Sequence, residues 1–227
     1  MHDIKNTRRD ILVLGFMSIM IMFVVDYLIQ PIFVIKSAIK VVLFLGVPLM
    51  YGYLNRYVDV LSIFKVKSKK QLKYSILLGI AIYLVILGAY YLFAGFLDLD
   101  NIQSLLAQNL GVDRNNFIFV AIYIAIFNSL LEEFFFRGFL FLGLKELGMG
   151  SLSTLLSAGM FSLYHIAIIA NWFNILIFIL VILGLFIGGL IFNALNNRNG
   201  NIYNSWLVHM FANLAINTVG LLMFGII

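Results

Sequence analysis

The 227-residue sequence contains no cysteine, which excludes disulfides, cysteine-ligated metals and cysteine nucleophiles. Charge is also scarce, since charged side chains make up 11% of the residues, against about 25% in an ordinary soluble domain. Only three histidines are present, His2, His165 and His209. Few residues are therefore available for metal binding or for acid–base chemistry.

Apolar residues are abundant instead. They form 63% of the sequence and include 22 phenylalanines. A water-soluble protein of this composition would have too few polar side chains to cover its surface. We therefore expect an all-α fold, a polytopic transmembrane bundle that forms a single membrane domain over residues 1–227. The net charge of +5 is then expected to lie in loops beside anionic lipid rather than to bind nucleic acid.

Seven stretches are long and apolar enough to cross a bilayer, which requires roughly 20 residues. The predicted spans are Ile11–Leu28, Lys36–Leu54, Tyr74–Leu97, Phe117–Leu144, Ser151–Ile169, Trp172–Leu195 and Ser205–Ile227. At a rise of about 1.5 Å per residue, Glu132 and His165 lie about 20 Å from their span starts, but His209 lies only about 6 Å from its own. Either the preceding connection enters the membrane or the last span begins earlier than Ser205. We expect the earlier beginning.

Basic residues are concentrated in two segments that a hairpin of the first two spans would place on one side. Three occur in the N-terminal tail and six between Asn55 and Lys73. The segment after the third predicted span has three aspartates and one basic residue, Arg114. Cytoplasmic loops carry an excess of Lys and Arg, so we expect a cytoplasmic N-terminus and an outer C-terminus. Abundant Asn, Ile and Lys indicate an AT-rich bacterial genome and hence a bacterial plasma membrane.

Two lysines fit this orientation less well. Lys36 and Lys40 would lie toward the outer end of the second predicted span, where a charge is expensive. We expect them to extend toward the interface or to pair with Asp26. The lysine-rich loop is interpreted as an orientation signal, with docking of an anionic partner as the alternative.

Ionisable residues inside apolar spans are the strongest functional signal, since each costs something like 2.5–3.5 kcal/mol on insertion. The fourth predicted span contains Glu132, Glu133 and Arg137. Glu133 and Arg137 have the i, i+4 spacing at which opposite charges meet on a helix. We predict that they pair and leave Glu132 unpaired, and an unpaired carboxylate in a low-dielectric cavity suits a general base. The alternative is a structural ion pair beside an unrelated glutamate.

Both histidines outside the N-terminal tail fall within predicted spans. His165 follows Phe161 by four residues, and His209 precedes Asn213 by four, so each pair shares a helix face. His209 and Asn213 could donate hydrogen bonds to a developing oxyanion. With a water activated by Glu132 and His165, they would form a hydrolase site. The alternatives are a packed core histidine and hydrogen bonds that hold helices together.

A glycine pattern in the sixth predicted span indicates a close helix contact. Gly184 and Gly188 form a GxxxG sequence, and Gly189 follows directly. Such spacing is typical of helices that approach closely in membranes, and we assign it no other role.

The polar clusters resemble the motifs of the CPBP family, which comprises the type II CaaX prenyl proteases and the bacteriocin-processing or Abi membrane proteins. That family carries EExxxR, FxxxH and HxxxN/D motifs on successive spans. They correspond here to Glu132-Glu133-xxx-Arg137, Phe161-xxx-His165 and His209-xxx-Asn213, in the same order. The stretch from Gly184 through Asn199–Ile202 to His209 also looks like the family's approach to its last motif. The resemblance covers residues 117–217 as a catalytic core, and residues 1–116 look like the variable N-terminal spans.

The resemblance implies an all-helical intramembrane endopeptidase whose site lies in a cavity open toward the cytoplasm. It implies that Glu132 is the base, with Glu133, Arg137 and Phe161 in supporting roles. It also implies a glutamate-type mechanism without a cofactor. The alternative is a zinc site formed by His165, His209 and Glu132.

The resemblance leaves the substrate open. We expect a peptidase that cleaves a small peptide or a membrane-associated, lipidated protein from the cytoplasmic side, as in bacteriocin processing, pheromone processing or self-immunity. One alternative is a non-catalytic membrane partner of a sensor kinase or a bacteriocin receptor. Another is a small transporter with Glu132 as a proton relay, although the sequence shows no inverted repeat. The expected partners are the lipid bilayer and a peptide or lipidated protein substrate, with a membrane signalling partner as the alternative.

Overall fold

The computed structural model describes residues 2–55, 57–66, 69–198 and 200–227. Over these ranges it is 85% helical and contains no strand, which confirms the predicted all-α fold. Within the described ranges, six helical stretches are long and apolar enough to cross a membrane. Arg56 and Lys67, which contribute to the predicted orientation signal, and Asn199, part of the family resemblance, lie outside the described residues.

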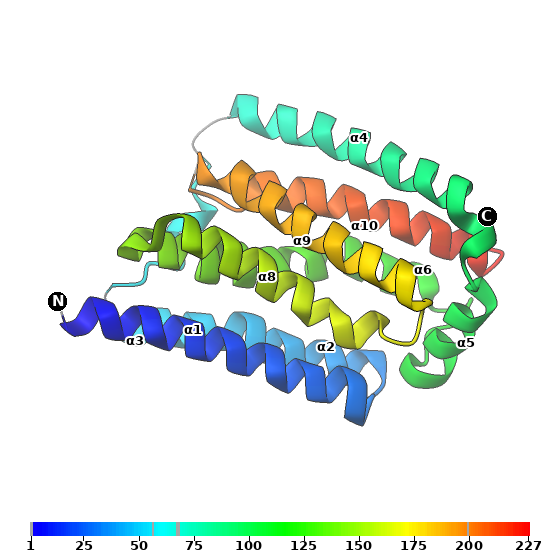
Figure 1. The fold of residues 1–227 in the computed structure, drawn as a ribbon, viewed down its shortest axis with the longest axis horizontal. Helices are drawn as coiled ribbons and strands as arrows, with labels where there is room; N and C mark the ends of the chain where they lie inside the picture. The colour runs from blue at the N-terminus through cyan, green and yellow to red at the C-terminus, as the bar shows by residue number, and fades with distance from the viewer. Residues whose placement is uncertain (1, 56, 67–68, 199) are drawn as a thin grey trace.

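The long helices lie side by side along one direction, and the two termini are at opposite ends of the bundle (Figure 1). Wider π-helical turns extend or join several of the helices, as at Val24–Ile29, Val42–Gly46, Tyr123–Asn128 and Glu133–Leu142. In chain order the α-helices are α1 (His2–Phe23), α2 (Phe33–Val41), α3 (Val47–Leu54), α4 (Lys69–Phe93), α5 (Leu99–Leu110), α6 (Phe117–Ile122), α7 (Ser129–Glu132), α8 (Gly150–Ile169), α9 (Ile175–Asn197) and α10 (Tyr203–Met223).

The fourth and fifth predicted spans belong to one helical stretch of 53 residues, Phe117–Ile169. The chain reverses within it at Gly148 and Gly150, whose φ angles of 87° and 54° are readily adopted only by glycine. After this turn α8 packs against the preceding leg, and the Ser157 hydroxyl donates to the Phe136 carbonyl at 2.7 Å. The stretch therefore passes through the bundle twice, and the seven predicted passes are present in six helical stretches.

The last helix begins at Tyr203, two residues before the predicted boundary. This difference moves His209 by only about 3 Å, so a late boundary alone does not explain its depth. The connection before α10 is itself buried. Ile202 has no exposed surface, and its backbone N–H donates to the Ile63 carbonyl at 3.2 Å. Ile63, in the apolar part of the lysine-rich loop, packs over this connection and is itself buried.

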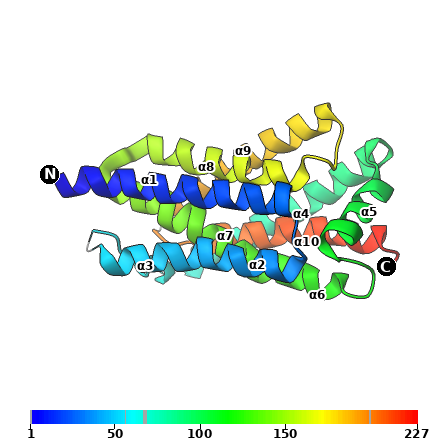
Figure 2. The ribbon, with the colours of Figure 1, turned by 90° about the horizontal axis from the view of Figure 1, so that it is seen from below.

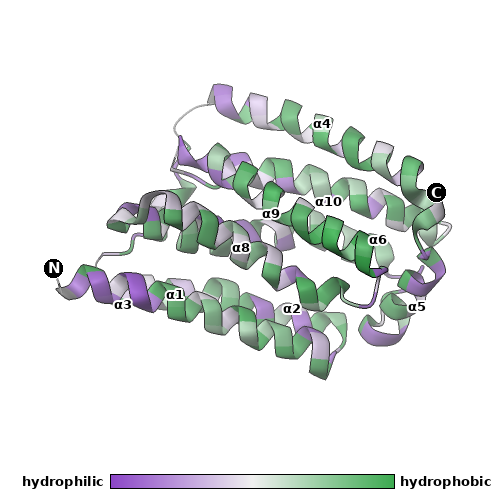
Figure 3. Ribbon diagram, in the orientation of Figure 1, coloured by the Kyte–Doolittle hydropathy of each residue, from purple (hydrophilic) through white to green (hydrophobic). Residues whose placement is uncertain are grey.

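Helix α5 has no counterpart among the predicted spans, because it is short and amphipathic. The Asp98 side chain caps its N-terminus by accepting from the Asn101 backbone N–H at 3.0 Å, and Gly111, with φ 64°, ends it. Figures 1 and 2 place α5 at the end of the bundle opposite the N-terminus. Figure 3 shows hydrophilic residues at the start of α1, at the start of α4 and along α5, with hydrophobic residues along the helices between them.

The core of the bundle is aromatic. The leg that follows α7 contributes Phe134, Phe135 and Phe136, each at most 2% exposed. Phe44, in the turns between α2 and α3, stacks on Phe135 with ring centroids 4.1 Å apart. Phe161 of α8 meets Phe136 edge to face at 5.3 Å. We call Phe134, Phe135, Phe136 and Phe161 the aromatic floor, because they lie directly beneath the site described below.

The glycine pattern is only partly predictive of packing. A Cβ added at Gly184 or Gly188 would meet nothing from a neighbouring element within 4 Å, so the predicted close contact at these two residues is wrong. At Gly189 an added Cβ would lie 3.0 Å from the Cα of Ala158 in α8. The close approach of α8 and α9 therefore requires the glycine that follows the GxxxG sequence.

Replacing Gly189 by Leu should separate α8 from α9 and destabilise the fold by about 1–3 kcal/mol, as overpacking does in well-packed cores. Gly188→Leu, one residue earlier, is the matched control and should have little effect. The midpoint of thermal unfolding in detergent checks both variants. Equal midpoints for the two would contradict this account of the α8–α9 contact.

Candidate active site

The predicted site residues converge from three parts of the chain. Glu132 ends α7, His165 lies in α8, and His209 and Asn213 lie in α10. All four line one cavity of about 320 Å³, within the size range of small-molecule and peptide sites. Residues that are separated by up to 81 positions along the chain thus meet around one space in the apolar interior of the bundle.

Glu133 and Arg137 form the predicted ion pair. The Glu133 Oε1 and Arg137 Nη1 atoms are 3.1 Å apart, and neither side chain has exposed surface. The guanidinium also lies over the rings of Phe161 and Phe192, at 4.1 and 4.8 Å from their centroids. Such stacking further stabilises a buried cation. The pair is therefore buried against aromatic rings and does not line the cavity.

His209 lies between the two glutamates. Its Nδ1 is 2.9 Å from Glu133 Oε1, and its Nε2 is 3.5 Å from Glu132 Oε2. Because an ionised carboxylate only accepts hydrogen bonds, Nδ1 carries a proton that it donates to Glu133. The ring also stacks on Phe192, with centroids 5.2 Å apart. Glu133 thus fixes the orientation of His209 and leaves Nε2 facing Glu132.

The prediction that Glu132 is unpaired is wrong. The Lys40 ammonium lies 2.5 Å from Glu132 Oε1, and the Asn128 amide donates to the same oxygen at 3.0 Å. An isolated charge in this interior would be very costly, and the lysine of α2 neutralises it. Only one carboxylate oxygen takes part in these bonds. Oε2 remains available to interact with His209 and with a water molecule.

Lys40 and Asn128 are the site residues that the sequence analysis missed. Asn128 accepts from the Lys40 ammonium at 2.5 Å and therefore bonds both members of the ion pair. The signal for Lys40 was its poor fit to the charge pattern of the spans. For the two lysines we predicted either extension toward the interface or pairing with Asp26, and Lys36 makes that pair at 2.7 Å. For Asn128 the signal was its position four residues before Glu132, on the same helix face.

His165 is held by its own helix. Its Nδ1 lies 2.7 Å from the Phe161 carbonyl oxygen one turn earlier, so Nδ1 is the donor in this bond. In the neutral ring Nε2 is then an acceptor. The rings of Phe161 and Tyr164 meet the imidazole edge to face at 4.7 and 5.0 Å. His165 is thus presented to the cavity in one orientation, with a nitrogen able to accept a proton.

Asn213 shares the cavity wall with His209, as the spacing predicts. Its Nδ2 donates to the Ile124 carbonyl at 3.2 Å. One turn further along α10, Asn217 makes a similar bond to the Ala121 carbonyl at 2.8 Å. Since a carboxamide has two N–H donors, Asn213 keeps one of them for a ligand.

The cavity extends in one direction from the site. On every helix that lines it, the lining residues run toward the end of the bundle where α5 lies: 33–40, 117–132, 164–173 and 209–223. In the opposite direction the aromatic floor is at most 2% exposed. The resemblance implied a cavity open to the cytoplasm, and the charge pattern implied a cytoplasmic N-terminus. These two expectations conflict, because the cavity extends toward α5, and α5 lies at the end of the bundle opposite the N-terminus (Figure 1).

The zinc alternative does not fit the observed arrangement. In the part of the chain that the structure describes, no three His, Asp or Glu residues form a group that could hold a metal ion. Glu132 faces the Lys40 ammonium, which would repel a divalent cation, and His209 Nδ1 is already bonded to Glu133. We therefore derive no chemical step that uses a metal ion.

One family model matches part of the chain. Residues 114–215 match the family model described as type II CAAX prenyl endopeptidase Rce1-like. This segment contains all three motifs, from Glu132 to Asn213, and it nearly coincides with the predicted core of residues 117–217. Over residues 114–215 the match confirms the resemblance to the CPBP family, which is a family of membrane proteases. No curated protein and no solved structure matches the chain.

Replacing Lys40 by Met should leave the Glu132 carboxylate buried without a counter-ion and destabilise the fold by about 3–5 kcal/mol. The double variant Lys40→Met with Glu132→Gln should regain most of this stability, because neither charge is then present. Thermal unfolding in detergent measures both.

The control for this comparison is Arg9→Met, which removes an ion pair with Asp10 whose side chains are 68% and 36% exposed. Such a pair contributes at most about 1 kcal/mol. A loss for Lys40→Met no larger than that for Arg9→Met would contradict the assigned ion pair.

Proposed function

We propose that this protein is an intramembrane endopeptidase that hydrolyses a peptide bond in a small peptide or a membrane-associated substrate. One observation supports it most directly. Glu132, His165, His209 and Asn213 line the same cavity at a depth where polar groups are costly. A base, a second proton acceptor and two hydrogen-bond donors are the groups that hydrolysis of an amide requires.

In the proposed reaction Glu132 is the general base. Its Oε1 is bonded to Lys40 and Asn128, so a water molecule bonds to Oε2 and loses its proton there as it attacks the peptide carbonyl. The Nε2 atom of His165 accepts a hydrogen bond from the same water and orients it. Lys40 is a positioning residue, because its ammonium holds the carboxylate at the cavity wall. The proton taken up by Glu132 then passes to the leaving amine.

The tetrahedral intermediate carries a negative oxygen that needs donors. Asn213 offers the N–H that is not bonded to Ile124. His209 already donates Nδ1–H to Glu133, so it stabilises the oxyanion only with a second proton on Nε2. In that form each ring nitrogen has a carboxylate oxygen as a neighbour, at 2.9 Å for Glu133 and 3.5 Å for Glu132. Preorganised donors of this kind are a major source of catalysis.

The finer features of the proposal concern the substrate and the mechanism. A glutamate base that acts without a metal fits the ion pair at Glu132. As the substrate we propose a bacteriocin-type or pheromone-type precursor at a bacterial plasma membrane. Such a peptide can associate with the membrane, and the site is surrounded by lipid-facing helices. A non-catalytic role as a membrane partner would require neither a base nor donors in a cavity, and no contact of the site favours it.

Glu132→Gln should abolish cleavage, with a loss of about 10²–10⁴-fold, because the amide cannot accept the proton of the water. Mass spectrometry of small peptides from cells that express each variant at matched membrane levels measures this. Glu146→Gln, an exposed glutamate outside the cavity, is the control. A peptide that is produced by the wild type and by Glu132→Gln in equal amounts would refute the proposal.

Asn213→Ala should lower kcat by about 10²–10³-fold with a smaller change in KM, as expected for loss of an oxyanion donor. Asn217→Ala removes a matching bond between α10 and a carbonyl of α6. It therefore reports the structural cost of losing such a bond. Equal kcat values for the two variants would assign Asn213 a structural role only.

A further inference from the structure

The two ends of the bundle carry opposite charge. The end with the N-terminus holds most of the basic residues that the structure describes: Lys5, Arg8, Arg9, Lys65, Lys70, Lys73, Lys145 and Arg198. The end with α5 holds the acidic residues Asp26, Asp98, Asp100 and Asp113 and the basic residues Lys36 and Arg114. Because basic residues accumulate on the cytoplasmic side of membrane proteins, this pattern places α5 on the non-cytoplasmic side.

Among the described residues, the cavity extends from the site toward the α5 end. Above the site, the inner face of α5 lines the cavity through Ile102, Leu106 and Leu110. Below it, the aromatic floor and the buried Arg137 fill the space between the helices. At the basic end the buried residues Ile63 and Ile202 close the connection before α10. A substrate that approaches from the basic end meets packed side chains.

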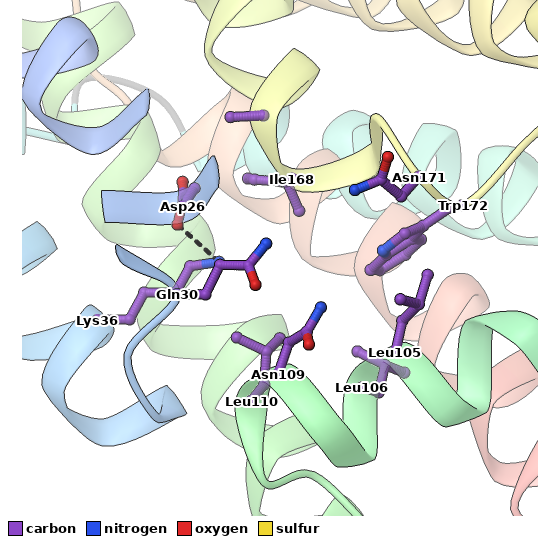
Figure 4. Close-up of a pocket in the computed structure, with 11 residues that line it drawn as sticks. Asp26, Gln30, Lys36, Leu105, Leu106, Asn109, Leu110, Ile168, Asn171 and Trp172 are labelled. Atoms are coloured by element: carbon purple, nitrogen blue, oxygen red, sulfur yellow. Dashed lines mark ion pairs between the residues drawn. The ribbon is translucent and has the colours of Figure 1, made fainter. Parts of the chain in front are cut away.

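Polar residues also line a second cavity at the α5 end. Beside the main cavity lies a smaller one of about 40 Å³, and Figure 4 shows the Asp26–Lys36 ion pair with Gln30, Asn109 and Asn171 around it. We call these five residues the polar rim. Both cavities are lined by Lys36, Leu106, Leu110, Ile168 and Trp172, so they are neighbours. The amides of the rim can hydrogen-bond an extended peptide backbone.

We propose that the substrate is a peptide segment that reaches the site from the non-cytoplasmic face, past α5, rather than from the cytoplasm. Its backbone contacts the polar rim, and a large apolar side chain next to the cleaved bond occupies the space beneath Ile102, Leu106 and Leu110. The cleavage step rests on the proposed function. The side of access rests on the cavity and the charge pattern, and can be tested without any measurement of cleavage.

The absence of cysteine makes this test direct. Gln108→Cys places a single thiol on the exposed face of α5, and Val66→Cys places one at the basic end, where Val66 is 47% exposed. A membrane-impermeant maleimide added to intact cells should label Gln108→Cys, and should label Val66→Cys only after lysis. The reverse pattern, with Val66→Cys labelled in intact cells and Gln108→Cys protected, would overturn the proposal.

A third thiol tests the cavity itself. Asn213→Cys should react with a small impermeant methanethiosulfonate reagent from outside intact cells, because the cavity connects it with the α5 end. If it reacts only with reagent on the other side of the membrane, as in inverted vesicles, the proposed route is wrong.

The last test measures peptide release by labelled and unlabelled variants. A bulky impermeant reagent attached at Leu106→Cys should reduce peptide release relative to the same variant untreated, since the label fills the cavity. The same label at Ala107→Cys, on the exposed face of α5, is the matched control. If no variant and no wild-type sample releases a peptide, the proposed function fails, while the labelling pattern still decides the side of access.

Discussion

The need to neutralise charge inside an apolar bundle determines most of this structure. Glu133 and Arg137 have no exposed side-chain surface, and Glu132 and Lys40 have almost none. Removing one partner of such a pair is far more costly than losing a surface ion pair. The helices that carry the partners are therefore held in place relative to one another. The position of α2 follows from Lys40, and the face of α10 that meets the site follows from His209.

The features that the sequence predicted are those that depend on local spacing. The Glu133–Arg137 pair and the shared face of His209 and Asn213 follow from the helical repeat alone. The Lys40–Glu132 bond joins residues 92 positions apart, and no spacing rule relates them. The close contact at Gly189, rather than at Gly184 and Gly188, depends on how α8 is rotated against α9. The direction in which the cavity extends depends on the packing of all the helices. A resemblance confined to three motifs therefore does not predict it.

The part of the chain that matches the family model and the part outside it contribute different groups to the site. The groups proposed for the chemical step, apart from Lys40, lie within residues 114–215. Much of the cavity wall near the entrance comes from α2 and α5, through residues such as Phe33, Ile102 and Leu106. Relatives that share the core could therefore act on different substrates through changes in these two helices. Lys40 links the two parts, since it comes from α2 and holds the proposed base.

The aromatic floor has a consequence for the membrane as a barrier. Hydrolysis requires water deep in the bundle, beside carboxylates and imidazoles that readily exchange protons. A chain of water molecules that continued across the membrane would dissipate the ion gradients on which the cell depends. The closely packed rings of Phe134, Phe135, Phe136 and Phe161 leave no room for such a chain. The site of a transporter opens to each side in turn, whereas these rings close the side of the site away from α5. Water at the proposed site is therefore compatible with an insulating membrane.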